Sequence, residues 1–561
     1  FASQGTTGWL CSVLTDTPEQ TLWCLDQAKA AMKEEGDWAQ LLGVHLEGPF
    51  LASQYKGAMP EHLLQKGSAE LFAKYEAAGE GAVRYMTVSP EVEGVPAMVR
   101  DIAARVKVAI GHSGAEYDTA MECIANGAVS ATHTFNAMRL FHQQINIPQD
   151  SLYGSLVQIP QAGGSSLFLR HLGMMAYLFQ DAGYPVYDNT TTEYLSTGEI
   201  KFARLKDELS KARHYIFLEY FIIQEGIMWN SVLELLEEKV KKGVDVRLLF
   251  DGMGCLTTLP ADYERELRKK GIQCKVFNPF VPVLSTVYNN RDHRKIAVID
   301  GHTAFTGGIN LADEYINAYV KYGHWKDSSI LVKGEGVWSF TMLFLQMWYC
   351  DDPAALCALP RSEFDQYRPS YYHPQEFDSD GLVQPYGDSP MDNQRVGENV
   401  YLNLIYGAKD YLYITTPYLI MDSELRYALC VAAKRGVDVR FITPFVPDKA
   451  LVHMTTRSGY QELVEAGIRI YEYTPGFIHS KTVVCDDQVA TVGTINFDFR
   501  SLYLHFECGV WMYRTKAMKQ VKADFLETLQ SCREITLEDC KRVPVYRRLF
   551  WSVLRLFSPL M

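Results

Sequence analysis

The sequence predicts an α/β protein in which a parallel βα segment precedes a duplicated α/β domain. Residues 1–145 alternate short apolar runs with longer amphipathic stretches, which is typical of parallel strands joined by helices. Residues 186–535 contain a repeat of about 190 residues, which is long enough to be a duplicated domain. Hydrophobic residues make up 47% and charged residues 22% of the 561 residues, so folded domains should cover most of the chain.

The formal charge of -13 argues against nucleic acid as the main partner. Residues 1–150 carry 18 acids and 10 bases and the remainder 49 acids and 44 bases, so neither part is a basic domain. The 12 cysteines are scattered, which indicates reduced thiols rather than a disulfide framework or a zinc ribbon. There is neither a long apolar run nor a signal-peptide pattern, and the chain begins at Phe1. We therefore expect no membrane-spanning helix, and a fragment at the N-terminus.

Side chains that can bind a metal gather where the predicted strands of the first segment end. The sequence predicts strands at 41–46, 106–110 and 128–132, and helices at 90–105 and 118–127. The polar residues that follow the three strands are His45 and Glu47, His112 and Ser113, and His133 and Asn136. Such strand ends form the active-site face of a (β/α) barrel, and one Glu with two His suits zinc or another divalent metal. Histidines that only cap loops are an equally good interpretation.

Three motifs around these residues resemble N-acetylglucosamine-6-phosphate deacetylase, a family of the amidohydrolase superfamily. They are HLEGPF at 45–50, GHS at 111–113 and THTFNAM at 132–138. The resemblance covers residues 5–143 and implies that Glu47, His112 and His133 bind a divalent metal such as zinc. The family's first strand, and the later strand with its general acid/base Asp, have no counterpart, so a metal-bound water would lack its proton acceptor. We expect an incomplete (β/α) barrel fragment without deacetylase activity.

The match ends near Phe141, and residues 143–164 form a polar stretch with Gly and Pro that we interpret as a junction. Residues 165–180 are apolar but short and interrupted by charge, which favours an interfacial or packed helix. The sequence leaves open whether the join is a genuine fusion or an artefact of gene assembly or truncation. The expected divisions of the whole chain are 1–145, the junction 146–182, two domains at 183–375 and 376–535, and a C-terminal segment at 536–561.

The repeat carries the same chemical motif twice. KGVDVR at 242–247 recurs as RGVDVR at 435–440, and each half ends in a motif of the form H-x-K-x4-D. The residues of the two motifs, with the Asn that follows each at the same spacing, are His293, Lys295, Asp300 and Asn310, and His479, Lys481, Asp486 and Asn496. Identical spacings in both copies make chance a poor explanation. The remaining alternative is a strand whose His and Lys are merely surface residues.

These residue types suit the chemistry of a phosphate diester. His and Lys two residues apart on a strand project from the same face, so both can reach one ligand. An imidazole can attack phosphorus, while an ammonium and an amide stabilise charge on the phosphate oxygens. A second imidazole from the other copy can protonate the leaving oxygen. The sequence therefore predicts one shared phosphodiester site.

The repeat resembles the phospholipase D superfamily, and within it the bacterial cardiolipin synthases, from residue 183 to the end of the chain. The motifs that carry the likeness are EYFII at 219–223, NNRDHRK at 289–295, GGINLADEY at 307–315, QPYGDSP at 384–390, TPY at 416–418 and YLHFEC at 503–508. The resemblance implies two α/β domains that form one active site, transfer between two phosphatidylglycerols to give cardiolipin and glycerol, a phosphohistidine intermediate and no cofactor. It further implies that Asp327 holds the ring of His293 and Glu507 that of His479. We expect Asp300 and Asp486 to brace the half-sites.

Membrane contact is expected although the transmembrane helices that normally precede this domain are replaced by the deacetylase-like segment. Residues 541–561 contain five Lys and Arg, no acid and several aromatic residues, which suits an anionic membrane surface. A last helix packed on the domain is an equally good interpretation. We expect an enzyme at the bacterial cell membrane. The alternatives for the whole chain are a hydrolytic phosphodiesterase of the same superfamily, acting on lipid or nucleic acid, and a non-catalytic chimera.

Overall fold

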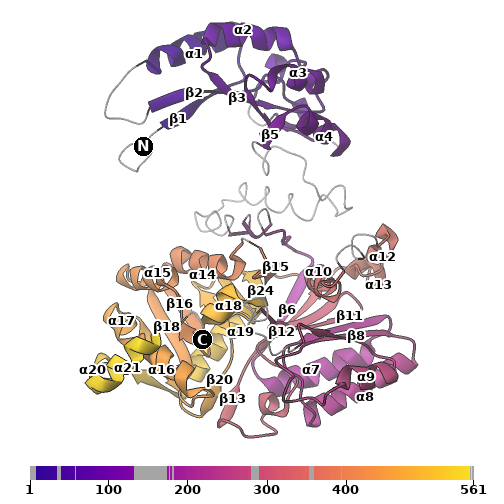
Figure 1. The fold of residues 1–561 in the computed structure, drawn as a ribbon, viewed down its shortest axis with the longest axis vertical. Helices are drawn as coiled ribbons and strands as arrows, with labels where there is room; N and C mark the ends of the chain where they lie inside the picture. The colour runs from indigo at the N-terminus through magenta and orange to yellow at the C-terminus, as the bar shows by residue number, and fades with distance from the viewer. Residues whose placement is uncertain are drawn as a thin grey trace. The chain divides into compact units, whose positions relative to one another are not determined.

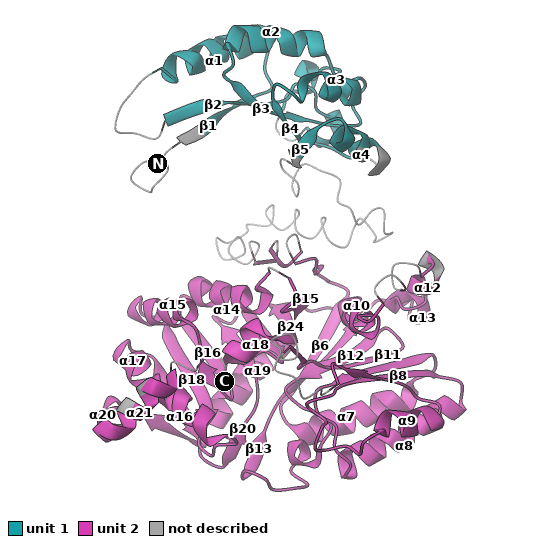
Figure 2. Cartoon of the chain, in the orientation of Figure 1, with its two compact units in different colours: residues 1–149 teal, residues 150–561 magenta. Residues whose placement is uncertain are grey.

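The computed structural model divides the chain into two compact units, residues 1–149 and 150–561, which Figure 2 shows in different colours. The residues whose structure is described are 8–33, 40–56, 59–115, 117–131, 174–175, 177–179, 182–279, 290–352, 355, 359–392, 394–555 and 558. The predicted ligand His133 and most of the predicted junction lie outside these residues. Each unit is described by itself.

The first unit is a parallel sheet with the strand order β1-β2-β3-β4-β5. Its strands are β1 (Gly8–Leu14), β2 (Gln40–Glu47), β3 (Val83–Val88), β4 (Lys107–Ile110) and β5 (Ala128–Ala131), and its α-helices are α1 (Pro18–Ala31), α2 (Ala69–Gly79), α3 (Val95–Ile102) and α4 (Tyr117–Ala125). The three predicted strands and two predicted helices are confirmed, although α3 is shorter than the predicted 90–105. Consecutive parallel strands are what a fragment of a (β/α) barrel contains.

The first half of the repeat forms a seven-stranded sheet in the order β6-β14-β12-β11-β7-β8-β9. The strands are β6 (Thr190–Leu195), β7 (Tyr215–Tyr220), β8 (Asp245–Asp251), β9 (Gln273–Phe277), β11 (Lys295–Ile299), β12 (Thr303–Gly307) and β14 (Ser329–Gly334). The longer helices of this domain are α7 (Gly198–Lys211), α8 (Ile227–Lys241), α9 (Tyr263–Lys269) and α10 (Val337–Trp348). Every residue of β7 and of β11 is buried, as expected for central strands covered on both faces.

The second half repeats this topology in a nine-stranded sheet. Its strands are β15 (Leu382–Asp388), β16 (Tyr411–Thr415), β18 (Asp438–Pro444), β19 (Arg469–Tyr473), β21 (Thr482–Cys485), β22 (Val489–Gly493), β24 (His505–Tyr513) and β25 (Cys532–Ile535), together with β10 (Arg291–Asp292) from the first half. The helices include α14 (Val396–Gly407), α15 (Ser423–Lys434), α16 (Ala450–Ser458), α17 (Tyr460–Glu465) and α19 (Lys516–Leu529). The sequence-predicted duplication is therefore confirmed strand by strand.

The recurring glycine of the KGVDVR and RGVDVR motifs has a conformational cause. Gly243 and Gly436 follow the ends of α8 and α15 with φ of 83° and 94°, in the left-handed region that favours glycine. A left-handed residue after a helix terminates it and redirects the chain. The next residues then enter β8 and β18. The motif thus marks the same helix-to-strand turn in both domains.

The two sheets share a core, so the halves form one unit. Phe217 and Val298 of the first half and Val484 and Val510 of the second belong to the same cluster of buried residues. Two short parallel pairings also cross the boundary, β10 with β24 and β13 (His324–Lys326) with β20 (Gly476–Ile478). Figure 1 shows β13 and β20 side by side. The first half thus contributes β10 to the sheet of the second half, and β13 and β20 form a small sheet between the halves.

The described residues of the predicted 165–180 helix pack against the second domain. Met174, Met175 and Leu178 are buried in the core of the second domain together with residues of α14. No helix in the described ranges has the length and apolar character needed to cross a membrane.

Candidate active site

The two copies of the motif meet in one cavity of about 590 Å³, as the sequence predicts. His293 lies between β10 and β11, and His479 lies between β20 and β21. Both line the cavity, and so do the two asparagines of the motifs, Asn310 and Asn496. The duplicated α/β fold thus brings together residues that are almost 190 positions apart.

His293 is held by a carboxylate of the other domain. Its Nδ1 lies 2.9 Å and 3.0 Å from the two carboxylate oxygens of Glu507, whose side chain is fully buried. Phe221 meets the imidazole edge-on, with 5.0 Å between the ring centroids. Because Nδ1 faces an acceptor, it carries the proton, and Nε2 is left as the nitrogen with a lone pair.

His479 is held in the same way, by a carboxylate of the first domain. Its Nδ1 lies 2.7 Å from Oδ2 of Asp327, which belongs to the first domain and is also fully buried. Trp325 and Phe477 lie beside the imidazole, with ring centroids 5.5 Å and 5.9 Å away. The aromatic walls fix the ring, so that its Nε2 is the nitrogen left for a ligand in the cavity.

The predicted pairing of acids and imidazoles was wrong: Glu507 holds His293, and Asp327 holds His479. The cause is the pair of short strands that cross the domain boundary. The backbone N–H of His293 donates to the carbonyl of Phe506, 3.0 Å away, next to Glu507. The N–H of His479 donates to the carbonyl of Lys326, 2.7 Å away, next to Asp327. Each motif therefore continues a strand that pairs with the other domain's acid-bearing segment.

The two motif lysines are buried beside the histidines. Lys295 donates a hydrogen bond to the carbonyl of His293, and Lys481 donates one to the carbonyl of His479. Burial lowers the pKa of Lys295 to about 8 and that of Lys481 to about 7. An anionic phosphate in the cavity would favour the charged form of both ammonium groups.

The two motif asparagines are held differently. Oδ1 of Asn310 accepts a hydrogen bond of 2.9 Å from the N–H of Ile222, and its Nδ2 lies 2.7 Å from the hydroxyl of Tyr315. Nδ2 of Asn496 lies 3.1 Å from Asp498, while its buried Oδ1 has no hydrogen-bond partner within the described ranges. Asn496 thus offers the cavity an acceptor that Asn310 does not.

Asp300 and Asp486 lie outside the cavity lining and brace the strands behind it. The carboxylate of Asp300 accepts hydrogen bonds of 2.8–2.9 Å from the backbone N–H groups of residues 213–215, just before and at the start of β7. That of Asp486 accepts bonds of 2.8–3.0 Å from residues 409–411, at the start of β16. These contacts are those expected of a bracing role, because they fix the strands that neighbour β11 and β21.

Burial and the neighbouring charges determine the protonation states of the two histidines and of the carboxylates that hold them. Burial lowers the pKa of His293 well below its usual value and that of His479 to about 4. Burial alone would raise the pKa of Glu507, but the adjacent imidazole of His293 outweighs it and holds this carboxyl below its usual range. The same balance, with His479 as the neighbour, lowers the pKa of Asp327. The resting site therefore pairs neutral imidazoles with ionised carboxylates.

Further lining residues were not singled out from the sequence. The cavity lining contains the cations Arg291, Lys321, Lys449 and Arg500 and the carboxylates of Glu314, Asp448 and Asp498. Aromatic side chains line it as well, namely Phe221, Tyr315, Tyr322, Trp325, Tyr418 and Phe477. Cations among aromatic side chains suit a phosphate with apolar substituents. These residues come from both halves, some of them from the short strands β10, β13 and β20, and they share no common spacing, so the duplicated motif did not mark them as site residues.

Two of the three predicted metal ligands of the first unit meet. Nε2 of His112 lies 2.9 Å from Oε1 of Glu47, and both side chains are buried. His45 instead directs its Nε2 to the hydroxyl of Thr87, 2.7 Å away. A carboxylate and an imidazole at this separation fit a divalent metal as part of a ligand set. The third predicted ligand, His133, lies outside the described residues, so the complete set stays a prediction.

Comparison with known proteins gives the same assignment for the duplicated unit. The family model described as "Cardiolipin synthase, PLD-like domain" matches residues 205–324 and 401–529. A cardiolipin synthase of Halalkalibacterium halodurans is 36% identical over 68% of this chain and 74% of its own length. An uncharacterized protein of Streptococcus mutans is 48% identical over 70% of this chain and 83% of its own length.

Two solved structures are similar to parts of this chain. A phosphatidylserine synthase of Haemophilus influenzae superposes with a TM-score of 0.50 and 16% identity, over 66% of this chain and 95% of that chain. An N-acetyl-D-glucosamine-6-phosphate deacetylase of Mycobacterium smegmatis is 34% identical, over 25% of this chain and 36% of that chain, with a TM-score of 0.23. The first likeness supports the fold of the duplicated unit. The second superposition is too poor to test the role of the first unit.

Proposed function

We infer a mechanism from the premise that the chain belongs to the cardiolipin synthase family of phospholipase D-like enzymes. Its relatives identify it as a phosphatidyltransferase with cardiolipin synthase function. We propose that it joins two phosphatidylglycerols and releases glycerol. One observation carries the proposal: two imidazoles, each oriented by a buried carboxylate, line a single cavity.

In the first step, Nε2 of His293 attacks the phosphorus of one phosphatidylglycerol. The new N–P bond replaces the bond between phosphorus and the glycerol oxygen, and His479 donates the proton that this oxygen needs. Burial lowers the pKa of His479 to about 4, but a phosphodiester anion beside it favours the protonated imidazole. Glycerol leaves, and a phosphatidyl group remains on His293.

In the second step, the neutral His479 takes a proton from a hydroxyl of the second phosphatidylglycerol. The resulting oxygen attacks phosphorus and displaces the imidazole of His293, which gives cardiolipin and returns both histidines to their starting state. We assign to Lys295 and Lys481, which are buried and bonded to the carbonyls of His293 and His479, the role of stabilising charge on the phosphate oxygens in both steps. The unsatisfied Oδ1 of Asn496 can accept a hydrogen bond from a glycerol hydroxyl.

We assign the nucleophile to His293 for two reasons. Superfamily members with a duplicated motif more often use the first copy. In addition, Glu507 offers both of its oxygens to His293 at 2.9–3.0 Å, whereas Asp327 holds His479 through Oδ2 and accepts the N–H of Ser328 with Oδ1. The family is consistent with a reaction that needs no cofactor.

The test is to mix purified chain with phosphatidylglycerol vesicles, with and without EDTA, and to measure cardiolipin and glycerol. We expect both products in equal amounts and undiminished activity in EDTA. The His293→Ala and His479→Ala proteins should each lose at least ~10³-fold in turnover, because parts that act as a unit fail together. Phosphatidic acid in place of cardiolipin would identify a hydrolase. Complete loss on chelation, restored by zinc, would contradict the mechanism.

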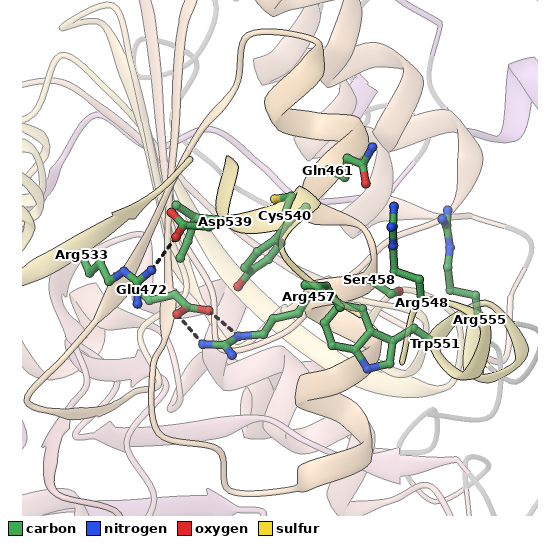
Figure 3. A pocket seen from close by; sticks show the side chains of 13 residues that line it. Arg457, Ser458, Gln461, Glu472, Arg533, Asp539, Cys540, Arg548, Trp551 and Arg555 are labelled. Atoms are coloured by element: carbon green, nitrogen blue, oxygen red, sulfur yellow. Dashed lines mark hydrogen bonds and ion pairs between the residues drawn. The ribbon is translucent and has the colours of Figure 1, made fainter. Parts of the chain in front are cut away.

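We further propose that the C-terminal helix α21 (Val545–Arg555) attaches the enzyme to an anionic membrane. One face of this helix packs on the second domain: Leu554 is buried, and Trp551 lines a cavity of about 320 Å³ with Arg457 and Glu472. Figure 3 shows Trp551, Arg548 and Arg555 at this cavity. The contact with α16 supports the packed interpretation for this face.

The other face of α21 is apolar and exposed. Val545, Tyr546, Phe550 and Val553 are 73%, 69%, 49% and 47% exposed, and their spacing places them on one side of the helix. Lys541, Arg542, Arg547 and Arg548 add exposed positive charge along the same segment. An apolar face with basic flanks suits the interface of a membrane rich in anionic lipid. The two interpretations of this segment are thus compatible, since each concerns a different face.

A further inference from the structure

A third histidine, His505, lies beside His293 and is not used by the proposed mechanism. It opens β24, two residues before Glu507, and its ring centroid is 5.4 Å from that of His293. Its side chain is 10% exposed and lines the active-site cavity. Neither ring nitrogen has a hydrogen-bond partner among the residues that the structure describes. A buried imidazole with unsatisfied nitrogens, facing a cavity, is poised to bind a ligand.

The two half-sites differ at this position. Trp325 lies two residues before Asp327 on β13, and its ring centroid is 5.5 Å from that of His479. Trp325 and His505 therefore occupy equivalent places in the duplicated site. An indole offers only an N–H donor, whereas an imidazole offers a lone pair to a metal. Only the His293 half-site thus combines two imidazoles with a carboxylate.

The donor atoms are spaced for a small divalent ion. Oε1 of Glu507 lies 2.9 Å from Nδ1 of His293 and 3.7 Å from Nδ1 of His505. Ligands of a tetrahedral zinc with bonds of about 2.0–2.1 Å lie roughly 3.3 Å apart, between these two distances. One donor atom from each of the three residues lies within 4.8 Å of the other two. The hydroxyl of Thr494 donates to the other oxygen of Glu507 and holds the carboxylate in place.

We propose that His293, His505 and Glu507 form an inhibitory site for zinc or a similar divalent transition metal. The proposal rests on the role of His293 proposed above. A metal bound to Nδ1 of His293 takes the place of the proton there, and the neutral ring then carries its proton on Nε2. The lone pair that attacks phosphorus is lost. The ammonium of Lys295 nearby opposes a cation, so we expect a weaker site than a closed structural zinc site.

Metal binding is tested on the full chain, freed of metal with EDTA and desalted. Cobalt(II) is titrated as a spectroscopic substitute for zinc, and zinc binding is measured by calorimetry. We expect His505→Asn to lose one site or to weaken it at least ~10-fold, with loss of the visible cobalt bands of that site. Glu47 and His112, which could also bind metal, are unchanged in the variant. A difference in metal binding between the parent and the variant therefore comes from the site at His505. His302→Asn, a half-buried histidine on the turn before β12, is the matched control and should bind like the parent.

Inhibition is tested with phosphatidylglycerol vesicles and increasing zinc. We expect zinc to inhibit the parent protein and to require at least ~10-fold more metal to half-inhibit His505→Asn, each protein being compared with its own metal-free rate. His505→Gln repeats the comparison if the Asn variant unfolds, as judged by circular dichroism. Equal binding by parent and variants, or binding without inhibition, overturns the proposal. If the parent makes no cardiolipin, the function proposed above fails, while the cobalt titration still decides whether the site exists.

Discussion

Glu507 and Asp327 each orient a histidine of the other domain, and this exchange explains why the motif occurs twice in one chain. A buried imidazole without its carboxylate would lose the fixed tautomer that presents Nε2 to the cavity. Because Glu507 reaches His293 and Asp327 reaches His479, neither domain holds a complete half-site by itself. Transfer of a phosphatidyl group therefore requires both domains in one folded unit.

The roles of the two histidines can be separated by trapping. In the His479→Ala protein, a p-nitrophenyl phosphodiester needs no protonation of its leaving group, so His293 should still attack it. Without His479 to activate an acceptor hydroxyl, the phosphoryl adduct should accumulate. Acid-quenched mass spectrometry is expected to find it on a peptide that contains His293.

The reciprocal variant is the control for this assignment. The His293→Ala protein keeps His479 and Asp327 but lacks the proposed nucleophile, so it should carry no adduct. An adduct found only on His479 in this protein would reverse the assignment. The absence of an adduct in both proteins would favour direct displacement of glycerol by the second phosphatidylglycerol.

The pH dependence of kcat/KM should reflect the loss of charge from Lys295 and Lys481. Burial lowers the pKa of Lys481 to about 7 and that of Lys295 to about 8, so both lose their charge far below the usual pH. A neutral amine attracts phosphate less, and kcat/KM of the free enzyme should therefore fall as the pH rises through 7 to 8. Lys481→Arg, which stays charged, should shift this fall to higher pH, whereas Lys333→Arg outside the cavity should not. An unshifted profile in Lys481→Arg would exclude Lys481 as its cause.

The sequence predicted that the two motifs meet but not how the acids pair with the imidazoles. His293, Lys295, His479 and Lys481 follow from a spacing that occurs twice, and spacing on a strand fixes the face of each side chain. The partner of an imidazole depends instead on tertiary contacts. Strands as short as β10 and β13 leave no periodic pattern, so the sequence did not reveal that they cross to the other domain.

At the scale of elements, alternating apolar runs located strands and helices of the first unit, and the recurring KGVDVR and RGVDVR motifs located the repeat. The glycines of these motifs follow α8 and α15, and the structure has both in the left-handed region. For α21 the pattern was ambiguous. An amphipathic helix can bury its apolar face in a protein or in a membrane, and composition alone does not distinguish them. In the structure Leu554 is buried and Phe550 is exposed, so one face of α21 packs on the protein and the other is exposed.

The outer face of α21 should determine binding to vesicles. Phe550→Asp replaces a half-exposed ring by a charge and should weaken sedimentation with phosphatidylglycerol vesicles by at least ~10-fold, because the interface rejects a carboxylate. Tyr427→Asp on α15, where the side chain is 70% exposed, is the matched control and should bind like the parent. Binding should also fall in high salt and with phosphatidylcholine vesicles. Equal sedimentation of the two variants would remove α21 from membrane attachment.

At the scale of the whole molecule, two compact units carry unrelated candidate sites. In the duplicated unit both motif histidines line one cavity, whereas the first unit brings together Glu47 and His112 of a predicted set of three ligands. In the first unit Glu47 ends β2 and His112 follows β4, whereas in the duplicated unit each H-x-K-x4-D motif runs through a strand, β11 or β21. A complete (β/α) barrel needs further strands, and the motifs of the first unit do not provide them.

The first unit should not deacetylate N-acetylglucosamine 6-phosphate, even with zinc supplied to the full chain. Glu47 and His112 meet at 2.9 Å and can share a metal, but the sequence lacks the strand that carries the family's general acid/base Asp. A metal-bound water would then have no group to take its proton, and acetate release should stay at the background rate. The measurement is acetate formed by the parent and by Glu47→Ala, with cardiolipin synthesis by both as the control for folding. Acetate release by the parent that Glu47→Ala abolishes would establish the first unit as a second, active enzyme.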